Sequence, residues 1–245
     1  MKRLDALWAF LTGIAAWQAL VMITGAPHFI LPSPLRVAST AIKSYEIILS
    51  NAWVTALEVG LGLVLGTALG VATAIHLTTS ILARRIMLPM LVFTQAVPVF
   101  ALAPILTLWF GYGIGSKVIM AVLIIYFPVT SAFHDGLSRT PPALLDLAKT
   151  MGATPRQSLW RLRIPHALPS LGTGLRLAAV YAPIGAVIGE WVGASKGLGY
   201  LMLLANGRAK IDLMFAALIT LAIMTVALHW AIGKLAARLD AYAQG

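Results

Sequence analysis

Six long apolar stretches dominate the sequence, and a chain that contains them cannot present a water-soluble surface. A helix needs about 20 apolar residues to cross the hydrocarbon core of a bilayer. Composition agrees, because only 11% of the residues are charged, whereas an ordinary soluble domain has about 25%. The sequence therefore predicts an all-α, polytopic membrane protein with six transmembrane helices, at about residues 7–23, 53–75, 86–110, 117–133, 171–192 and 213–232.

The first stretch follows a basic start, MKR, and could be read as a signal peptide. It is longer than the apolar part of a usual signal peptide and lacks a clean A-x-A cleavage site, so we interpret it as a spanning helix. No Gly/Ser linker or low-complexity tract divides the chain. We therefore expect residues 1–245 to form a single transmembrane domain.

The basic residues predict the orientation, because cytoplasmic loops are enriched in Lys and Arg. With a cytoplasmic N-terminus, 12 of the 18 Lys and Arg residues, Lys2 among them, lie inside. Both termini and the segment 134–170 are then cytoplasmic. The basic residues lie between apolar stretches and not on one soluble face, so no nucleic-acid partner is expected. The other six Lys and Arg residues are expected outside the cytoplasm, and they are Arg36, Lys43, Lys117, Lys196, Arg208 and Lys210.

Several kinds of chemistry are excluded by residues that the sequence lacks. There is no cysteine, so disulfides and thiolate metal sites cannot form, and the five histidines are scattered. No GxxxxGK[ST] phosphate loop is present, so the chain is not expected to bind or hydrolyse ATP itself. We expect no cofactor and no metal on this chain.

Two further patterns predict local structure. Residues 31–50 begin LPSP, with Ser33 as a helix cap and Pro34 in the first turn, and we expect an amphipathic helix on the outer surface or an ordinary connecting helix. In the second stretch, Gly62, Gly66 and Gly70 repeat every four residues. Such a smooth face lets another helix approach closely inside a membrane bundle.

The third stretch is expected to kink, because Pro98 and Pro104 each remove a backbone hydrogen bond. A kinked helix suits the wall of a substrate path, although a kink used only for packing is equally compatible. Acidic residues near the outer ends of the second and fifth stretches either contact substrate, snorkel to the interface or pair with a neighbour. The candidates for the substrate path are Gln95, Pro98, Phe100, Pro104, Glu190 and Trp191, with Glu58 as a further acidic candidate.

A charged segment at about 140–165 interrupts the apolar pattern. Thr140 and Pro141 are expected to start a short helix, which Gly152 ends because glycine accepts the left-handed conformation. Thr154-Pro155-Arg156-Gln157 has the form of a capping box, and we expect it to start a second short helix that ends at Ile164-Pro165. A rigid, broken element of this kind suits docking of a partner protein, while a basic membrane anchor is the alternative.

The same segment resembles the EAA signature of ABC importer permeases, E-A-A-x3-G-x9-I-x-L-P. Its spacing matches at every position, with Asp in place of Glu and Leu in place of the first Ala. LPSP at 31–34, VPVFALAPILTLWFGYG at 97–113 and GEWVGASKGLGYLM at 189–202 resemble the nitrate/sulfonate/taurine branch, and the region around the last is most like permeases for pyrimidine precursors of thiamine. The position of Glu58 often holds a basic residue in that branch. The residues at the positions of the signature are Asp146, Leu147, Ala148, Gly152, Leu162, Ile164 and Pro165.

The resemblance implies a transport subunit in a bacterial inner membrane. Two permease copies, with a homodimer expected, would enclose one path, two cytoplasmic ATPase subunits would use ATP and Mg²⁺, and an extracytoplasmic binding protein would deliver the substrate. The helix at Asp146–Gly152 would dock on the ATPase, with Arg156 as an ATPase contact or a surface anchor. A hydroxymethylpyrimidine-type thiamine precursor is the favoured substrate, with sulfonate or taurine, nitrate and riboflavin as alternatives. A secondary transporter and a membrane enzyme using His134-Asp135 are the rival classes.

Overall fold

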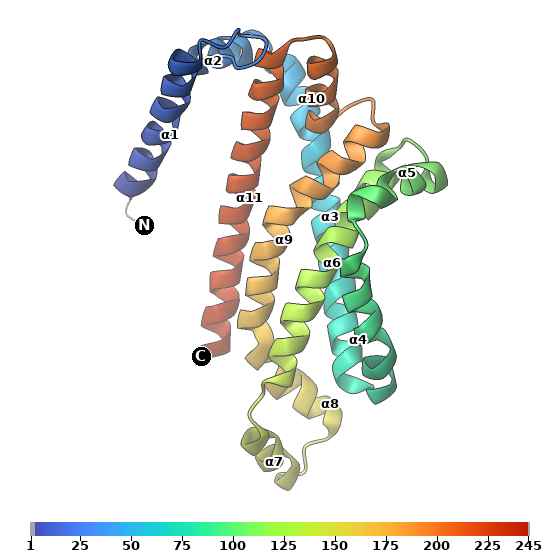
Figure 1. The fold of residues 1–245 in the computed structure, drawn as a ribbon. Helices are drawn as coiled ribbons and strands as arrows, with labels where there is room; N and C mark the ends of the chain where they lie inside the picture. Colours follow the sequence, from blue (N-terminus) through green and yellow to red (C-terminus); the bar gives the residue numbers. More distant parts are fainter. Residues whose placement is uncertain (1–2, 245) are drawn as a thin grey trace. The chain divides into compact units, whose positions relative to one another are not determined.

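The structure is a computed structural model that describes residues 3–244, and every regular element in that range is a helix. Lys2, counted above among the cytoplasmic basic residues, lies outside the described residues. Twelve helical segments follow one another along the chain (Figure 1). They are α1 (Arg3–Thr24), α2 (Pro34–Lys43), α3 (Tyr45–Thr79), α4 (Ile81–Ala96), α5 (Val99–Phe110), α6 (Ile114–Ser138), α7 (Pro142–Thr150), α8 (Pro155–Ser158), the π-helical η1 (Leu159–Arg163), α9 (Ile164–Gly193), α10 (Leu198–Gly207) and α11 (Ile211–Gln244).

By length and composition, four helices in the described part of the chain can each cross a membrane, and a fifth span results if α4 and α5 are taken together. The apolar part of α1 is the shorter stretch Trp8–Thr24. The all-α, polytopic class is therefore confirmed, whereas the number six stays a prediction.

The third predicted span is not one kinked helix, and this expectation was wrong. α4 ends at Ala96, α5 begins at Val99, and the two axes meet at 100°. Pro98 stands immediately before α5 in an extended conformation. A proline disfavours the helical conformation in the residue before it, so the helix stops at this point where a kink was expected.

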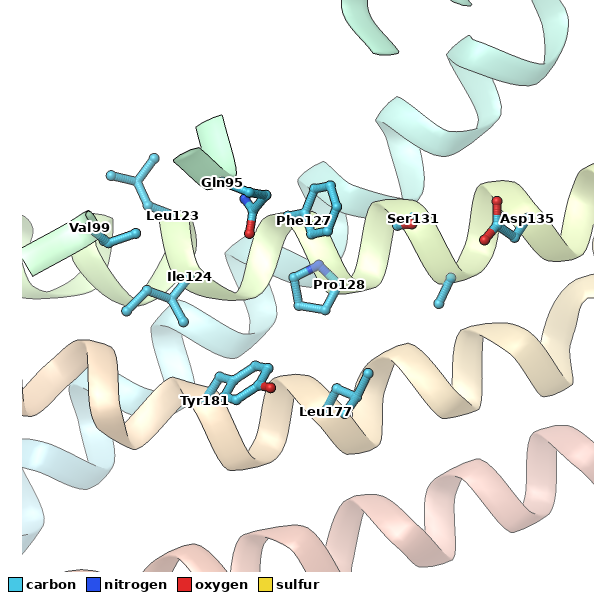
Figure 2. Close-up of a pocket in the computed structure, with 11 residues that line it drawn as sticks. Gln95, Val99, Leu123, Ile124, Phe127, Pro128, Ser131, Asp135, Leu177 and Tyr181 are labelled. Carbon is cyan, nitrogen blue, oxygen red and sulfur yellow. The ribbon is translucent and has the colours of Figure 1, made fainter. Parts of the chain in front are cut away.

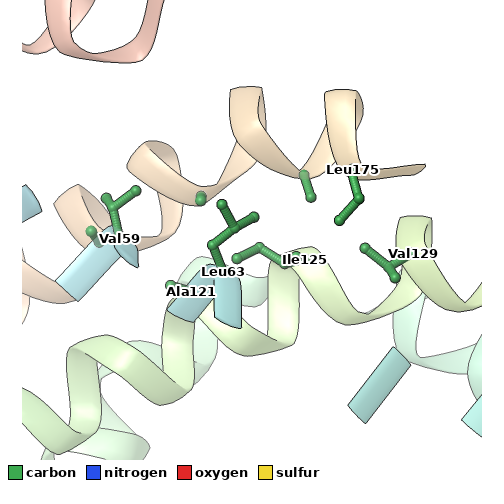
Figure 3. Close-up of a cluster of buried hydrophobic side chains, with 9 residues drawn as sticks. Val59, Leu63, Ala121, Ile125, Val129 and Leu175 are labelled. Atoms are coloured by element: carbon green, nitrogen blue, oxygen red, sulfur yellow. The ribbon is translucent and has the colours of Figure 1, made fainter. Parts of the chain in front are cut away.

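Contacts group the chain into two compact units, residues 1–55 with 195–223, and residues 56–194 with 224–245. The larger unit is built around α6, which runs beside α9 (Figure 1). Its core is a cluster of small and branched side chains (Figure 3). The buried members of that cluster are Val59, Leu63, Ala121, Ile125, Val129, Leu175, Ala178, Ala182 and Ala186.

The predicted glycine face of α3 packs against α6. A Cβ added at Gly62 would lie 2.5 Å from the Cβ of Ala121, and one at Gly70 would lie 2.9 Å from Val129 Cγ1. Gly66 is similarly close to Ile125. The glycines therefore permit a close approach of the two helices, as the spacing predicts.

In the smaller unit, side chains cap two helices. Ser33 Oγ accepts the backbone N–H of Arg36 and so caps α2, as expected. α10 begins after Gly197, which has no side chain to cap it. Asn51 Oδ1 accepts the Gly197 N–H and Thr55 Oγ1 accepts that of Leu198, both at 2.8 Å.

Candidate functional site

The charged segment forms a short helix, a tight bend and a second helical start, as predicted in outline. After α7, Gly152 has φ +80° and nothing lies near its Cα on the side where a Cβ would be. The Gly152 N–H donates to Lys149 O and the Ala153 N–H to Ala148 O, which is the pairing of a Schellman motif. Gly152 is thus required by backbone conformation and not by close packing.

The second helical start has the predicted capping box. Thr154 Oγ1 accepts the Gln157 N–H at 3.2 Å, and Gln157 Oε1 accepts the Thr154 N–H at 2.8 Å. Each side chain satisfies a backbone donor that has no partner within the helix. The bend between Gly152 and Thr154 is therefore fixed from both sides.

The start of α7 differs from the prediction. The helix begins at Pro142, its cap residue is Pro141, and no side chain caps it. The Thr140 hydroxyl instead donates to Leu137 O, at the end of α6. Pro142 disfavours the helical conformation in Pro141, so the helix begins one residue later than expected and Thr140 lies before the cap position.

The second helix does not end at Ile164-Pro165 as expected. It passes through a π turn at Leu159–Arg163 and continues as α9 to Gly193. In the π turn, the Ile164 N–H donates to Leu159 O, five residues back. The wider turn accommodates Pro165, which has no N–H to donate, without ending the helix.

The π turn also attaches the charged segment to the bundle. Leu159 is buried with Ala74, Phe133 and Leu137, and Ile164 packs against the same cluster. Leu162 and Pro165 are half-buried. Because α8, η1 and α9 are continuous, the charged segment joins without a break a helix that is long and apolar enough to cross a membrane.

The signature residues on α7 divide into two sides. Ala148 is buried, while Asp146 is exposed and Leu147 is 56% exposed. Leu144 and Met151 are also exposed apolar residues. Arg156 is exposed at the start of α8. α7 therefore presents apolar side chains and one carboxylate outward.

A cavity of about 670 Å³ lies beside the α4–α5 break. One face of α6 supplies most of its wall, since its lining residues recur every three or four positions. Figure 2 shows Phe127, Pro128, Ser131 and Asp135 following one another along α6, with Leu177 and Tyr181 on α9. The lining residues are Gln95, Val99, Leu123, Ile124, Phe127, Pro128, Ser131, Ala132, Asp135, Leu177 and Tyr181. We call this the α6 cavity.

Of the residues predicted for the substrate path, Gln95 lines the α6 cavity. Pro98 is exposed at the break beside it, and Phe100 and Pro104 are exposed on α5. Trp191 is 52% exposed on α9, while Glu190 is buried. The structure thus brings Gln95 to a cavity and separates it from Glu190, and the role of these residues in transport stays a prediction.

Three ionisable side chains meet inside the larger unit. Glu58 on α3, Lys117 on α6 and Glu190 on α9 are 3%, 1% and 1% exposed. The two glutamates interact electrostatically with each other and with Lys117. Lys117 Nζ donates to Tyr112 O at 2.8 Å and to Gly193 O, at the end of α9. We call these three residues the Glu58 cluster.

The Glu58 cluster resolves two sequence-based expectations. The glutamates do not snorkel to the surface, and they are associated with a charged neighbour. Lys117 was counted with the outer basic residues, but it is buried within α6 and its ammonium group joins α6 to the end of α9. The sequence did contain a signal for this packing, because Gly185, Gly189 and Gly193 repeat every four residues along α9. In the structure a Cβ added at Gly189 would lie 3.1 Å from Lys117 Cα, so this glycine lets α9 approach α6 closely at the lysine.

His134 and Asp135 do not form a joint site. His134 is buried and its Nδ1 lies 3.1 Å from Thr78 Oγ1 on α3. Asp135 lines the α6 cavity. Among the described residues, no group of three or more His, Cys, Asp and Glu is placed to hold a metal ion.

Comparison with known proteins gives consistent matches over most of the chain. Residues 62–241 match the family described as "Binding-protein-dependent transport system inner membrane component". A "Probable ABC transporter permease protein" of Haemophilus influenzae is 50% identical over 216 residues, which cover 88% of each chain. The formylaminopyrimidine transport permease protein ThiX of Halalkalibacterium halodurans is 40% identical over 205 residues, 82% of each chain.

The fold also matches a solved structure. A chain from inward-facing conformations of the MetNI methionine ABC transporter aligns with a TM-score of 0.69 and 18% identity. The alignment covers 80% of this chain and 98% of the other. At this level of identity the match supports the arrangement of helices and nothing finer.

Proposed function

This chain belongs to the binding-protein-dependent ABC transporter permeases, a family of membrane transport subunits whose ATP hydrolysis is performed by a separate ATPase, and we propose that it imports an aminopyrimidine precursor of thiamine. The single observation that supports the substrate is the 40% identity to a formylaminopyrimidine permease over 82% of each chain. Sulfonate or taurine, nitrate and riboflavin are the competing substrates.

The coupling to ATP is assigned to the segment 140–165. Docking needs a rigid element with an exposed face, and α7 has both: its C-terminus is fixed by the Gly152 bend, and Leu144, Leu147 and Met151 are exposed apolar residues. An exposed group of apolar side chains next to polar ones is typical of a surface that binds another protein. An ATPase bound there would move α8 and, through the continuous π turn, the spanning helix α9.

The proposed assembly contains two copies of this chain, two ATPase subunits that use ATP and Mg²⁺, and an extracytoplasmic binding protein. This chain would bind neither nucleotide nor metal. The second copy would close the open side of the α6 cavity, where Leu177 and Tyr181 of α9 are exposed. The complex would lie in the bacterial inner membrane, with both termini and the coupling segment in the cytoplasm.

Reconstitution into proteoliposomes tests the proposal. The chain is co-purified with its ATPase and supplied with its binding protein, and uptake of radiolabelled 4-amino-5-hydroxymethyl-2-methylpyrimidine is measured with and without ATP. We expect uptake only with ATP and the binding protein. Uptake by this chain alone, driven by an ion gradient, would contradict the proposal of an ATP-driven importer. If the binding protein bound taurine, nitrate or riboflavin and not the pyrimidine, the proposed substrate would be wrong.

A further inference from the structure

A second cavity, of about 450 Å³, lies between the end of α3, α7 and the π turn η1. α3 contributes Thr78 and Thr79, and α7 contributes Lys149. The π turn contributes Ser158 at its start and Arg163 at its end. None of the nine described residues that line this cavity is Asp or Glu. We call it the basic cavity, because its wall contains two cations and no carboxylate.

The two cations of the basic cavity are unpaired within residues 3–244. Arg163 is half-buried and Lys149 is exposed, and no hydrogen bond or ion pair joins either side chain to a described residue. Asp146 lies three positions before Lys149 on α7, yet these two residues do not form an ion pair. Ser158 is half-buried, and its hydroxyl also has no partner among these residues. Two positive groups and one hydroxyl donor are therefore available to a ligand.

The two threonines on the α3 side of the basic cavity use their hydroxyl hydrogens within their own helix. The Thr78 hydroxyl donates to Ala74 O at 2.8 Å. The Thr79 hydroxyl donates to Ile75 O at 3.0 Å. The free side-chain donors of the cavity therefore all belong to α7 and the π turn. A ligand that accepts hydrogen bonds from them would join these two parts of the charged segment across the Gly152 bend.

The π turn brings Ser158 and Arg163 to the same side of the helix. In an α-helix a turn takes 3.6 residues, so residues five apart point to different faces. Hydrogen bonds from residue i to residue i+5 widen the turn until five residues complete about one turn. The Ile164 N–H donates to Leu159 O in this way, and Ser158 and Arg163 line one cavity. π turns inside α-helices are frequently found at functional sites, and this one places a hydroxyl beside a guanidinium.

A phosphate group fits this set of donors. A guanidinium donates two parallel hydrogen bonds to phosphate oxygens, and a lysine ammonium adds a point charge. Trp160, in the same π turn, is 56% exposed, and tryptophan is enriched where a membrane meets water. Basic pockets beside spanning helices on the cytoplasmic side bind the headgroups of anionic lipids. Both the chemistry of the cavity and its position next to α9 therefore suit a phosphate at the membrane surface.

We propose that the basic cavity binds a phosphate group through Arg163, Lys149 and Ser158, and that the bound phosphate holds α7 against the π turn. The phosphate comes from the headgroup of an anionic phospholipid or from the free anion. The proposal goes beyond the transported substrate, and it rests on the proposed function in placing the segment 140–165 at the cytoplasmic surface of the membrane.

The test is binding of two probes to the purified permease–ATPase complex in detergent, with the ATPase sites filled by a non-hydrolysable ATP analogue. Phosphatidylglycerol is titrated by native mass spectrometry, and radiolabelled inorganic phosphate is measured by equilibrium dialysis. Arg163→Gln should weaken binding about tenfold to a hundredfold, the range for loss of hydrogen bonds to a charged group. Lys149→Gln removes an exposed charge and should weaken it up to about fivefold.

Matched variants separate the site from general surface charge and from folding. Arg163→Lys keeps the charge but loses the two parallel donors, so its binding should be intermediate. Arg139→Gln removes an exposed cation that does not line the basic cavity, and it should change neither measurement. The bound probe should slow amide exchange at residues 146–153 in the wild type and not in Arg163→Gln, because the contact between α7 and the π turn is then missing.

The two probes distinguish the sources of the phosphate. Binding of phosphatidylglycerol that Arg163→Gln weakens assigns the site to the lipid, and the same dependence for inorganic phosphate alone assigns it to the free anion. The site would be overturned if Arg163→Gln weakened the binding of neither probe, or if Arg139→Gln weakened it equally. ATP-dependent uptake is measured separately in proteoliposomes. Absence of uptake by the wild type contradicts the proposed function, whereas the binding measurements alone decide the phosphate site.

Discussion

The Glu58 cluster and the proposed coupling segment, residues 140–165, both contain several ionisable side chains, but these are buried in the cluster and exposed in the segment. In the cluster, two carboxylates and a lysine are almost completely buried and interact with one another. In the coupling segment, Asp146 and Arg156 are exposed, and neither is in an ion pair within the described part of the chain. The same residue types therefore serve a closed internal contact in one region and an open surface in the other.

This difference in burial indicates which region is closed to a partner and which offers an accessible surface. Lys117 joins α6 to the end of α9, and glycines keep these helices in close contact. A partner has no access to charges buried in this way. The coupling segment instead keeps its backbone satisfied through caps and leaves its side chains free for contact. Substitutions in the cluster should thus affect stability first, and substitutions in the coupling segment should affect coupling first.

The largest effect is expected from Lys117→Met. Removing one partner from a buried charged group leaves the others without compensation, which typically destabilises a protein by about 3–5 kcal/mol. Lys117 is 1% exposed, and its ammonium group also satisfies two carbonyl oxygens. Thermal unfolding of the detergent-solubilised chain should show a clear drop in Tm.

The double variant Lys117→Met with Glu190→Gln is the control for this loss. It removes one carboxylate along with the cation, so part of the lost stability should return. Glu190→Gln alone also tests the predicted substrate path, because a substrate contact would change KM while a structural contact would change Tm. An unchanged Tm in Lys117→Met would mean that the Glu58 cluster does not hold the helices together.

The next effect is loss of coupling in Gly152→Val. Gly152 has φ +80°, where an ordinary residue is destabilised by about 1–2 kcal/mol and a branched one by more. Nothing lies within 4 Å of an added Cβ, so the strain is confined to the bend. We expect the chain to insert and remain folded, while ATP-dependent uptake falls severely and ATP hydrolysis by the complex continues.

Gly152→Asn is the matched control, because asparagine adopts the left-handed conformation more readily than other side chains do. It should keep most of the uptake. If Gly152→Val also transported at the wild-type rate, the bend would have no part in coupling.

The sequence predicted the coupling segment more fully than the Glu58 cluster, and the reason is physical. Caps and left-handed glycines are local, so Gly152, Thr154 and Gln157 could be interpreted from their neighbours alone. The cluster joins residues 58, 117 and 190, and sequence alone placed the lysine at the outer end of the fourth predicted span. Only the packing of three helices brings these charges together.

The errors at the two prolines Pro165 and Pro98 also have a physical basis. Pro165 and Pro98 are both helix-disrupting residues, yet the helix continues through Pro165 and ends before Pro98. At Pro165 a π turn shifts the hydrogen bonds by one residue and so removes the conflict. No π turn precedes Pro98, and α4 ends there. Hydrogen-bond register of this kind is not visible in residue types.

A smaller effect is expected from Thr154→Ala. The threonine hydroxyl accepts the Gln157 N–H, and loss of such a cap typically destabilises a helix by about 1 kcal/mol. The bend should become more mobile, seen as faster amide exchange at residues 155–158, with a partial loss of uptake. Thr150→Ala is the control, because that hydroxyl bonds back to Asp146 O within α7 and caps nothing. Equal exchange in the two variants would argue against the capping box.

The smallest effect is expected from Arg156→Gln, and it decides between the two roles left open for that residue. Arg156 is exposed, so the free energy of unfolding should change by less than about 0.5 kcal/mol. An exposed ion pair contributes about 0.2–1 kcal/mol, so an ATPase contact would lower ATPase affinity up to about fivefold, and less at high salt. We expect this loss in detergent, measured by surface plasmon resonance, and no change for the exposed Arg161→Gln. A membrane anchor would leave the affinity in detergent unchanged and weaken only the interaction with anionic lipid, because the charge would then act on headgroups and not on the ATPase.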